Sequence, residues 1–490
     1  MKNNPRAWLV VLPPVLLLAL AAVLRFADLG SRPMHADEAV QAYIFADLLE
    51  EGKYRYDPSH YHGPLPHFIN LPLMRALGIR KLDTLQAWQF RLQPALAGLL
   101  LAALAGACAG GDSRARWRAM LLAGIAPMLL YFSRMAIHET LLALCALAVP
   151  FAVARWLETR RARWLIVTAL AFGCMHATKE TWCIIAFSWA VAAFALWPKK
   201  TWHAVRGAGA ARIALVAAAA MGISFLLYSN FGKHPGGFAD AWRTLFSYRT
   251  GGGHEKGWWY YAVECLGFYR PGGWPVGEGV VGLFAIAGGV MAWRRRKNRY
   301  VGHHVPALPL FLAVSGAAQV VVYSIIKYKT PWLMLAPLAS FVPLAAHGWI
   351  WALGRRPRWW RAAVCALVVA AGLLAPALVS SFKAPTSAAF PFVYVPTLPD
   401  ADAELDRVAR ALPADAMTAV IGNDYWPLPW YFRAARERTG FFSEAGAPSS
   451  EELKEFALVI HTGYQLDPSA TGPGWRVFEL RPGYFVSISR

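Results

Sequence analysis

A series of apolar stretches along the first four-fifths of the chain constrains its fold more than any other feature. A helix needs about 17–25 apolar residues to cross a bilayer, and most of the stretches reach that length, although two are shorter. The spans are predicted at about 8–26, 88–110, 117–132, 137–154, 164–178, 181–197, 212–229, 275–293, 305–326, 331–353 and 362–382. This pattern predicts an all-α polytopic membrane protein with about eleven transmembrane helices, the first of them an uncleaved anchor.

Composition excludes two other classes of protein. Apolar residues make up 57% of the 490 residues and charged residues only 16%, whereas soluble domains are close to half apolar and a quarter charged. A soluble enzyme and a disordered chain are therefore both excluded. Five of the six cysteines lie in or beside apolar stretches, so a framework of disulfides is not expected.

The positive charge is concentrated in alternate connecting segments. With the N-terminus placed inside, the inner segments contain 22 Lys and Arg residues and two acids, which accounts for the whole net charge of +20. These segments are 1–7, 111–118, 155–163, 198–212, 294–304 and 354–361. Because Lys and Arg accumulate on cytoplasmic loops, the chain is predicted to lie in the cytoplasmic (inner) membrane with its tail outside. The charge thus indicates topology and contact with membrane lipid, and gives no support for a nucleic-acid partner.

Three predicted outer segments are long, namely 27–87, 230–274 and the tail 383–490. The tail resembles a soluble domain in composition, with 13 acids and 9 bases over 384–490. Its predicted strands are Met417–Gly422, Ala457–His461, Val477–Leu480 and Tyr484–Ser489, and its predicted helices are Ala401–Leu412 and Glu451–Phe456. We therefore expect a transmembrane domain over 1–382 and a small extracytoplasmic α/β domain over 383–490, to which the sequence assigns no chemistry.

Ionisable residues gather at the outer ends of the predicted spans, where charges are costly unless they pair or serve a function. One group combines carboxylates with histidines, which suits a divalent metal or a general base. It comprises His35, Asp37, Glu38, His138 and Glu139. The other group is assigned to a substrate with a phosphate at the level of lipid headgroups. It comprises His62, Arg134, Lys179, Glu180, Lys327 and Lys329.

Each of these residues taken singly also fits a structural role. Asp37 suits a helix cap, Glu139 suits an ion pair with Arg134, and a lysine at the end of a span can simply reach the interface. Aromatic residues of the second outer segment fit either a belt at the membrane interface or faces on which sugars stack. The joint pattern favours a site, because three separated carboxylate positions and several cations converge on one side of the membrane.

Ordered motifs in the chain resemble those of a known family. An acidic pair in the first outer segment, many further spans and a soluble tail are similar to the GT-C membrane glycosyltransferases, which include protein O-mannosyltransferases and the aminoarabinose transferase of lipid A. The resemblance is closer to a prokaryotic branch called flippase-activity-associated proteins. The matching motifs are His35–Glu38, His62–Leu65, Thr178–Thr181, Tyr328–Trp332 and the tail run Tyr425–Tyr431.

This resemblance implies a polyprenyl-phosphate-linked sugar donor that enters sideways from the bilayer, with inversion at the sugar carbon. It assigns the base to Asp37, with Glu38 beside it in the catalytic pair as a metal or orienting ligand. Many relatives have another essential acid before the fourth span, where this chain has His138 and Glu139. Metal dependence therefore stays open, with Glu139, His138 and His35 as the candidate ligands of a divalent metal.

The sequence thus predicts an integral membrane glycosyltransferase that moves a sugar from a polyprenyl-phosphate donor to a glycan, lipid or protein acceptor on the outer face. The rival prediction belongs to another class of protein. In it the chain is a non-catalytic partner in lipid flipping or envelope assembly, and the same cations only guide a lipid phosphate. An ion-coupled transporter fits poorly, because the polar residues lie at the ends of the spans and not in their middles.

Overall fold

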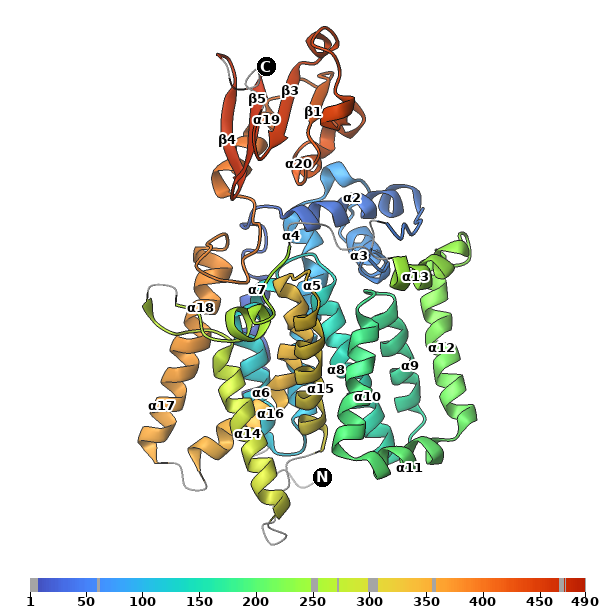
Figure 1. Cartoon of the computed structure of the whole chain (residues 1–490), viewed down its shortest axis with the longest axis vertical. Helices are drawn as coiled ribbons and strands as arrows, with labels where there is room; N and C mark the ends of the chain where they lie inside the picture. Colours follow the sequence, from blue (N-terminus) through green and yellow to red (C-terminus); the bar gives the residue numbers. More distant parts are fainter. Residues whose placement is uncertain are drawn as a thin grey trace.

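The computed structural model describes residues 8–59, 62–247, 254–270, 273–297, 307–354, 358–466, 471 and 473–489. Five of the bases predicted to lie inside fall outside these residues, namely Lys2, Arg6, Arg299, Arg355 and Arg356. The chain forms a long bundle of helices, with a layer of shorter helices across one end and a small sheet domain beyond that layer (Figure 1).

The apolar stretches fold as helices or as consecutive helical segments. They form α1 (Trp8–Phe26), α4 (Ala87–Phe90), α5 (Leu92–Cys108), α6 (Ser113–Ile125), α7 (Pro127–Phe132), α8 (Glu139–Thr159), α9 (Arg163–His176), α10 (Trp182–Leu196), α12 (Ala210–Tyr228), α14 (Gly279–Lys297), α15 (Ala307–Ile325), α16 (Leu335–Leu353), α17 (Trp359–Val369) and α18 (Ala375–Leu378). The prediction of a mostly helical chain is confirmed. A proline at the first position of α7 marks the break between α6 and α7, because proline favours a helix start over a helix interior.

The predicted count of eleven spans is not confirmed. Within the described residues, six helices are long and apolar enough to cross a membrane, or seven if a bent pair is counted as one span. Three further apolar helices, Leu12–Phe26, Arg163–His176 and Gly279–Arg294, are shorter than this. The bent pair is α10 followed by α11 (Pro198–Ala208), with an angle of 118° between them. The chain is an integral membrane protein with at least these long apolar helices.

Helix α16 lies at the centre of the bundle, with 83% of its apolar window buried. It packs against α14, α15, α6 and α8. Gly348 permits the closest of these contacts, because a Cβ at this position would lie 1.7 Å from the carbonyl oxygen of Phe284 in α14. By contrast, only 17% of the corresponding window of α12 is buried. The periphery formed by α9, α10 and α12 therefore offers most of its apolar surface to lipid.

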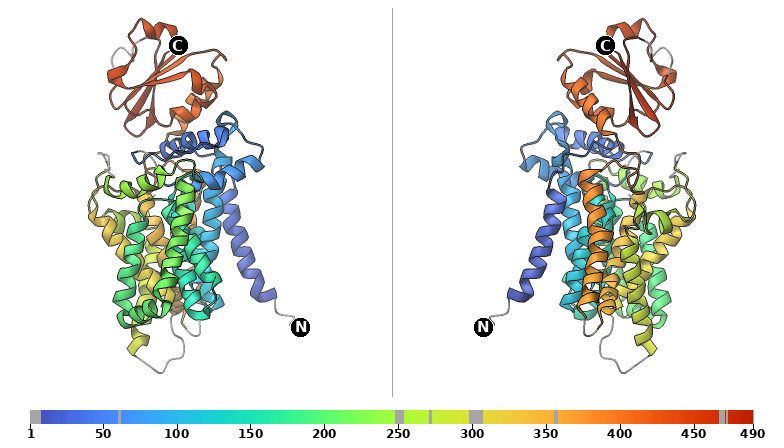
Figure 2. Two further views of the ribbon diagram at one scale, coloured as in Figure 1. Left: turned by 90° about the vertical axis from the view of Figure 1, so that its right-hand side faces the viewer. Right: turned by 90° about the vertical axis from the view of Figure 1, so that its left-hand side faces the viewer.

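The predicted outer segments contain helices that cross the end of the bundle. These are α2 (Ala36–Glu51), α3 (Leu65–Ala76), the 3₁₀ turn Leu82–Thr84 and α13 (Gly236–Ser247). The side views place this layer between the bundle and the sheet domain, and place the start of α1 at the opposite end of the bundle (Figure 2). His35 caps α2, since its Nδ1 accepts the backbone N–H of Asp37 and the Glu38 carboxylate accepts the N–H of His35. This cap fixes the direction of the two neighbouring acids.

The tail forms a five-stranded sheet in the order β2-β1-β3-β5-β4. Its strands are β1 (Thr418–Ile421), β2 (Thr439–Phe442), β3 (Leu458–Gly463), β4 (Arg476–Arg481) and β5 (Tyr484–Ser489). Strand β1 pairs in parallel with β2 and β3, whereas β5 runs antiparallel to β3 and β4. The four predicted strands and the helix α19 (Pro399–Arg410) are confirmed. Strand β2 was not predicted, because its short TGFF sequence contains a glycine and lacks alternation, and Glu451–Phe456 forms only a 3₁₀ turn at Glu452–Glu455.

The sheet domain contacts the layer of short helices through the tail motif Tyr425–Tyr431. This motif contains α20 (Leu428–Tyr431), which packs against α2. Trp426 lies edge-on against Tyr43 of α2, with ring centroids 5.8 Å apart. Arg436 lies over the same tyrosine and forms a 3.1 Å ion pair with Asp47. Helix α2 is therefore held from both sides, by the bundle and by the sheet domain.

Candidate active site

A cavity of about 490 Å³ lies at the end of the bundle that faces the sheet domain. Six of the residues predicted from the sequence line it together: Asp37, His62, His138, Glu139, Lys179 and Glu180. Apolar and aromatic residues line it as well, among them Ile184, Tyr323, Ile326, Tyr328, Trp332 and Leu333. Thus α2, the start of α8, the segment between α9 and α10 with the start of α10, α13 and α15 meet around a space whose lining combines charged with apolar side chains. Such a space suits a ligand with a charged head and an apolar tail.

Asp37 lies in the first turn of α2, where the positive end of the helix dipole favours an anionic side chain. It is half-buried and lines the cavity. His254 and Tyr394, which hydrogen-bond to each other, lie close enough for the Asp37 charge to act on both. Burial lowers the pKa of His254, and Asp37 opposes that shift. Asp37 is therefore the carboxylate of the acidic pair that a substrate in the cavity can reach.

Lys179 and Glu139 form a buried ion pair in the cavity wall. The Lys179 Nζ lies 2.5 Å from the Glu139 Oε1, and the two side chains are 7% and 4% exposed. Glu139 is the first residue of α8, and Lys179 follows the end of α9. The alternative of an ion pair between Glu139 and Arg134 is therefore wrong. The ammonium brings a positive charge into a region where water is largely excluded, which strengthens its attraction for an anion.

A second acidic partner holds a histidine at the cavity. The Nδ1 of His62 lies 3.0 Å from a carboxylate oxygen of Glu180. Burial would raise the pKa of Glu180, but His62 and Lys179 outweigh that effect and lower it to about 2. The ring of His138 meets the ring of His62 edge-on at 5.2 Å, and its Nε2 lies 3.0 Å from the carbonyl oxygen of Gly63. Burial, together with the nearby His62, His67 and Lys179, keeps the pKa of His138 well below its ordinary value.

Two of the sequence motifs pair through their backbones at this point. The N–H of Gly63 donates to the carbonyl of Thr178 at 3.0 Å, and the N–H of Leu65 donates to that of Ala177 at 2.9 Å. A Cβ on Gly63 would lie 2.3 Å from the carbonyl oxygen of Ala177. Glycine is therefore required where the His62–Leu65 and Thr178–Thr181 motifs meet, and this contact sets His62 opposite Glu180.

We expect Gly63→Ala to separate these two motifs. The added methyl group clashes with backbone and not with a flexible side chain, so the expected loss of stability is about 1–3 kcal/mol. The measurement is thermal unfolding in detergent. The matched control is Gly111→Ala, because a Cβ at Gly111 would meet no atom within 4 Å. Gly78 is unsuitable as a control, since its positive φ would itself strain an alanine. Equal unfolding midpoints for both variants would show that this contact tolerates a side chain.

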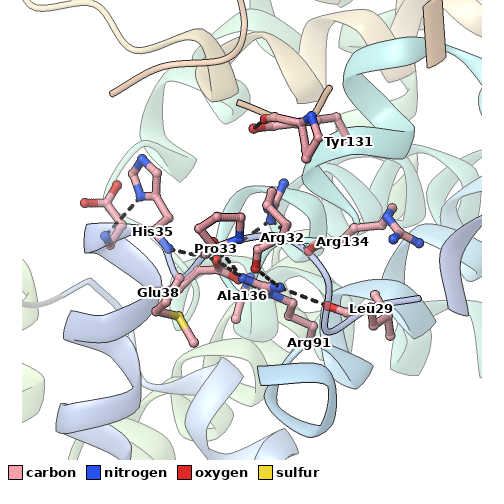
Figure 3. A network of polar contacts seen from close by, with 12 residues as sticks. Leu29, Arg32, Pro33, His35, Glu38, Arg91, Tyr131, Arg134 and Ala136 are labelled. Atoms are coloured by element: carbon pink, nitrogen blue, oxygen red, sulfur yellow. Dashed lines mark hydrogen bonds and ion pairs between the residues drawn. The ribbon is translucent and has the colours of Figure 1, made fainter. Parts of the chain in front are cut away.

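Glu38 lies outside the cavity, in a buried network that Figure 3 shows. Its two carboxylate oxygens accept hydrogen bonds from the Nε and Nη2 of Arg91, both at 2.7 Å, and one also accepts the N–H of Ala136 at 2.8 Å. Burial would raise its pKa, but Arg91 and then Arg32 lower it to about 2. The prediction that Glu38 acts with Asp37 in catalysis is therefore corrected, because its carboxylate is enclosed and fully bonded to the protein.

Arg134 is also corrected from a phosphate ligand to a structural residue. Its guanidinium donates to the carbonyls of Leu24, Arg25, Ala27 and Asp28 at the end of α1. Those carbonyls carry the negative end of the helix dipole, which a cation stabilises. The guanidinium also lies over the ring of Phe382 at 4.3 Å. Its donors are thus directed at protein carbonyls, and Arg134 does not line the cavity.

The two lysines of the loop before α16 lie beside the cavity and do not line it. Lys327 is exposed. Lys329 is 1% exposed; its Nζ donates to the carbonyl of Ile326, and it lies over the ring of Tyr261. Their prediction as phosphate ligands is therefore corrected. The residues on either side of Lys329, namely Tyr328 and Thr330, face the cavity instead.

The three predicted metal ligands do not come together. Both ring nitrogens of His35 are engaged, one by the N–H of Asp37 and one by the carbonyl of Tyr394. His35 is absent from the cavity wall, and Glu139 is paired with Lys179. Within the described residues, no group of three or more His, Cys, Asp or Glu side chains is arranged to hold a metal. The set of His35, His138 and Glu139 is thus corrected, and a divalent metal stays a prediction without assigned ligands.

Several cavity residues were not predicted from the sequence. Tyr328, Thr330 and Trp332 belong to the Tyr328–Trp332 motif, in which Lys329 was predicted as the ligand. The motif was therefore recognised, but the residues that line the cavity are its neighbours. Thr244 and Leu245 come from α13, a short helix within a predicted loop. Neither residue carries a sequence signal of its own.

Comparison with solved structures decides the fold. ArnT from Cupriavidus metallidurans matches with a TM-score of 0.65 over 97% of this chain and 97% of that chain, at 16% identity. The chain has the GT-C fold. The structure of ArnT bound to undecaprenyl phosphate matches equally well, covering 99% of this chain and 98% of that chain.

A second GT-C structure supports the same conclusion. The oligosaccharyltransferase of Archaeoglobus fulgidus matches with a TM-score of 0.57 at 12% identity, covering 94% of this chain and 70% of that chain. The oligosaccharyltransferase AglB from the same archaeon, solved in complex with an inhibitory peptide and a dolichol-phosphate, also matches with a TM-score of 0.57. No protein-family model matches the sequence, and neither does any curated protein sequence. The GT-C fold is therefore shown by structural similarity at low sequence identity.

Proposed function

We propose that the chain is an integral membrane glycosyltransferase that transfers a sugar from a polyprenyl-phosphate donor to an acceptor. The observation that carries this proposal is the cavity whose lining combines Asp37, Lys179 and the His62–Glu180 pair with apolar and aromatic side chains. Lipid phosphates occur in structures of the same fold, as undecaprenyl phosphate on ArnT and dolichol-phosphate on AglB. A donor with a charged head and a long apolar tail matches both kinds of lining residue.

In the proposed reaction Asp37 is the general base. It takes the proton of an acceptor hydroxyl while the hydroxyl oxygen attacks the anomeric carbon of the sugar. The bond between that carbon and the phosphate oxygen breaks at the same time, so the configuration inverts and the polyprenyl phosphate leaves with the electron pair. Asp37 is not consumed, because the proton passes on to solvent.

The cations of the cavity stabilise the leaving phosphate in this proposal. Lys179 is the only lysine among the described cavity residues, and its ammonium neutralises charge that develops on the phosphate oxygen. Glu180 holds the Nδ1 of His62, which leaves the Nε2 for a ligand. We further propose that this end of the bundle, together with the sheet domain, lies on the outer face of the cytoplasmic membrane, as the distribution of Lys and Arg predicts.

Binding of the lipid phosphate tests the proposed role of Lys179. We expect Lys179→Ala to weaken binding of a polyprenyl phosphate, titrated in detergent, by roughly tenfold to more than a hundredfold. This follows from the loss of a charge-assisted hydrogen bond, about 1.5–3 kcal/mol. Lys327→Ala serves as the matched control, because it removes the same charge from an exposed position outside the cavity.

Folding defects are separated from binding defects by a third variant. Lys179→Ala alone leaves the buried Glu139 carboxylate without the Lys179 ammonium. The double variant Lys179→Ala/Glu139→Gln is therefore titrated as well. If the double variant binds the lipid phosphate weakly and unfolds at the original midpoint, the proposal is supported. Affinities within about twofold of the original chain for both Lys179 variants would place the lipid phosphate elsewhere.

A further inference from the structure

Helix α11 (Pro198–Ala208) differs from the other helices at the end of the bundle opposite the sheet domain. It turns by 118° from α10 and runs across that end, below α9, α10 and α12 in Figure 1. None of its residues is buried, although it is 11 residues long. A helix with no fully buried residue is stabilised little by packing against the protein, so its position needs another stabilising partner.

The surface of α11 combines apolar and basic residues. At 100° per residue, Trp202 and Val205 share one side of the helix, and they are 51% and 48% exposed. Lys199, Lys200 and Arg206 occupy the adjoining arc of the helix, with Arg206 one turn on from Trp202 and Lys200 pointing away from it. Arg206 bends over the ring of Trp202, with its guanidinium 4.7 Å from the ring centroid. This is the pattern of a helix that lies in the plane of a membrane surface, with its apolar side among acyl chains and its bases among headgroups.

The surroundings of α11 add further positive charge. Arg160 and Arg161 lie in the turn before α9, Arg163 is the first residue of α9, and Arg212 lies in the first turn of α12; all four are exposed. The nearby Glu158 is paired with Arg155 at 2.5 Å. Among the described ion pairs, none involves the three bases of α11 or these four arginines. The charge of this region is therefore available to an anionic surface.

We propose that α11, together with the turn before α9 and the start of α12, forms a binding site for anionic phospholipid headgroups. The charge selects an anionic lipid over a zwitterionic one, and the adjoining apolar flanks of α10 and α12 accommodate its chains. Each base near an anionic surface contributes roughly fivefold to affinity. This site lies at the opposite end of the bundle from the cavity, so the inference does not depend on the proposed function.

The test measures binding of dioctanoyl phosphatidylglycerol to the full chain by native mass spectrometry in detergent, with dioctanoyl phosphatidylcholine as the neutral lipid. The variant Lys199→Gln/Lys200→Gln/Arg206→Gln is expected to lose at least tenfold in affinity for phosphatidylglycerol and to keep its affinity for phosphatidylcholine. The control variant Arg75→Gln/Arg80→Gln/Lys81→Gln removes three exposed charges near the sheet domain and is expected to bind as the original chain does.

Four results would overturn the proposal. One is unchanged phosphatidylglycerol binding by the α11 variant, and another is an equal loss by the control variant, which would mean that net charge alone attracts the lipid. The third concerns a different occupant of the apolar side. If Trp202→Glu dissociates an oligomer of this chain while lipid binding is unchanged, that side contacts a second copy instead. Inorganic phosphate at the same concentration is included to separate a headgroup site from a site for free anions, and competition by phosphate alone would also contradict the proposal.

Discussion

We expect Asp37→Asn to abolish sugar transfer while leaving the lipid-binding cavity intact. The substitution keeps the shape of the side chain but removes the proton acceptor, and a well-placed general base contributes about 10²–10⁴-fold in rate. Asp37 lines the cavity from the first turn of α2, and its backbone N–H, which donates to His35, is unaffected. The measurement is transfer from a polyprenyl-phosphate sugar, together with a titration of polyprenyl phosphate on the same preparation.

The matched control for this experiment is Asp83→Asn, at an exposed position of the 3₁₀ turn Leu82–Thr84. It makes the same change from carboxylate to amide at a position outside the cavity, so full activity is expected. A chain with Asp37→Asn that binds lipid and still transfers sugar at the original rate would remove Asp37 from the mechanism. If the original chain binds the lipid phosphate and transfers no sugar, the rival prediction of a flipping or assembly partner is favoured instead.

The sequence predicted the bundle well because hydropathy is a local property of each stretch. Every predicted span became a helix or consecutive helical segments, and four of the five strands of the tail were located. The number of spans was less accessible, since short helices such as α9 do not reveal from composition whether they cross the membrane. Helix α11 was missed for a related reason: its alternating bases and apolar residues resemble an ordinary charged loop until a 3.6-residue period is examined.

The site was predicted in part, and the errors share a physical cause. Successive residues of a helix point about 100° apart, so the neighbours Asp37 and Glu38 enter different surroundings: one faces the cavity and the other faces Arg91. The sequence does not reveal which of the two turns inward, because the partner lies 53 positions away. Arg134 shows the same effect, since its acceptors are the final carbonyls of α1. Pairing across long sequence separations decided these roles.

The same buried network carries the second large effect, which is on stability. We expect Arg91→Ala to lower the free energy of unfolding by about 3–5 kcal/mol, because it leaves the Glu38 carboxylate buried and unpaired. Both side chains of this pair are 0% exposed. Arg91 also donates to the carbonyls of Leu29, Arg32 and Pro33, so its loss would loosen the segment that leads into α2. The measurement is thermal unfolding in detergent, with Lys53→Ala in an exposed ion pair as the control expected to leave the midpoint unchanged.

The pH dependence of stability separates loss of this ion pair from general loosening. The folded pKa of Glu38 is about 2 and its ordinary value is 4.5. Because the folded pKa is the lower one, the stabilisation is complete above about pH 4.5 and decreases as the pH falls towards 2. In Arg91→Ala the cation that lowers this pKa is absent, so the folded pKa of Glu38 lies closer to or above its ordinary value, and the midpoint should fall less between pH 4.5 and 2 than it does in the original chain. If the two chains show parallel midpoints over pH 3–7, and Arg91→Ala unfolds at the original temperature, the network in Figure 3 does not stabilise the fold as described.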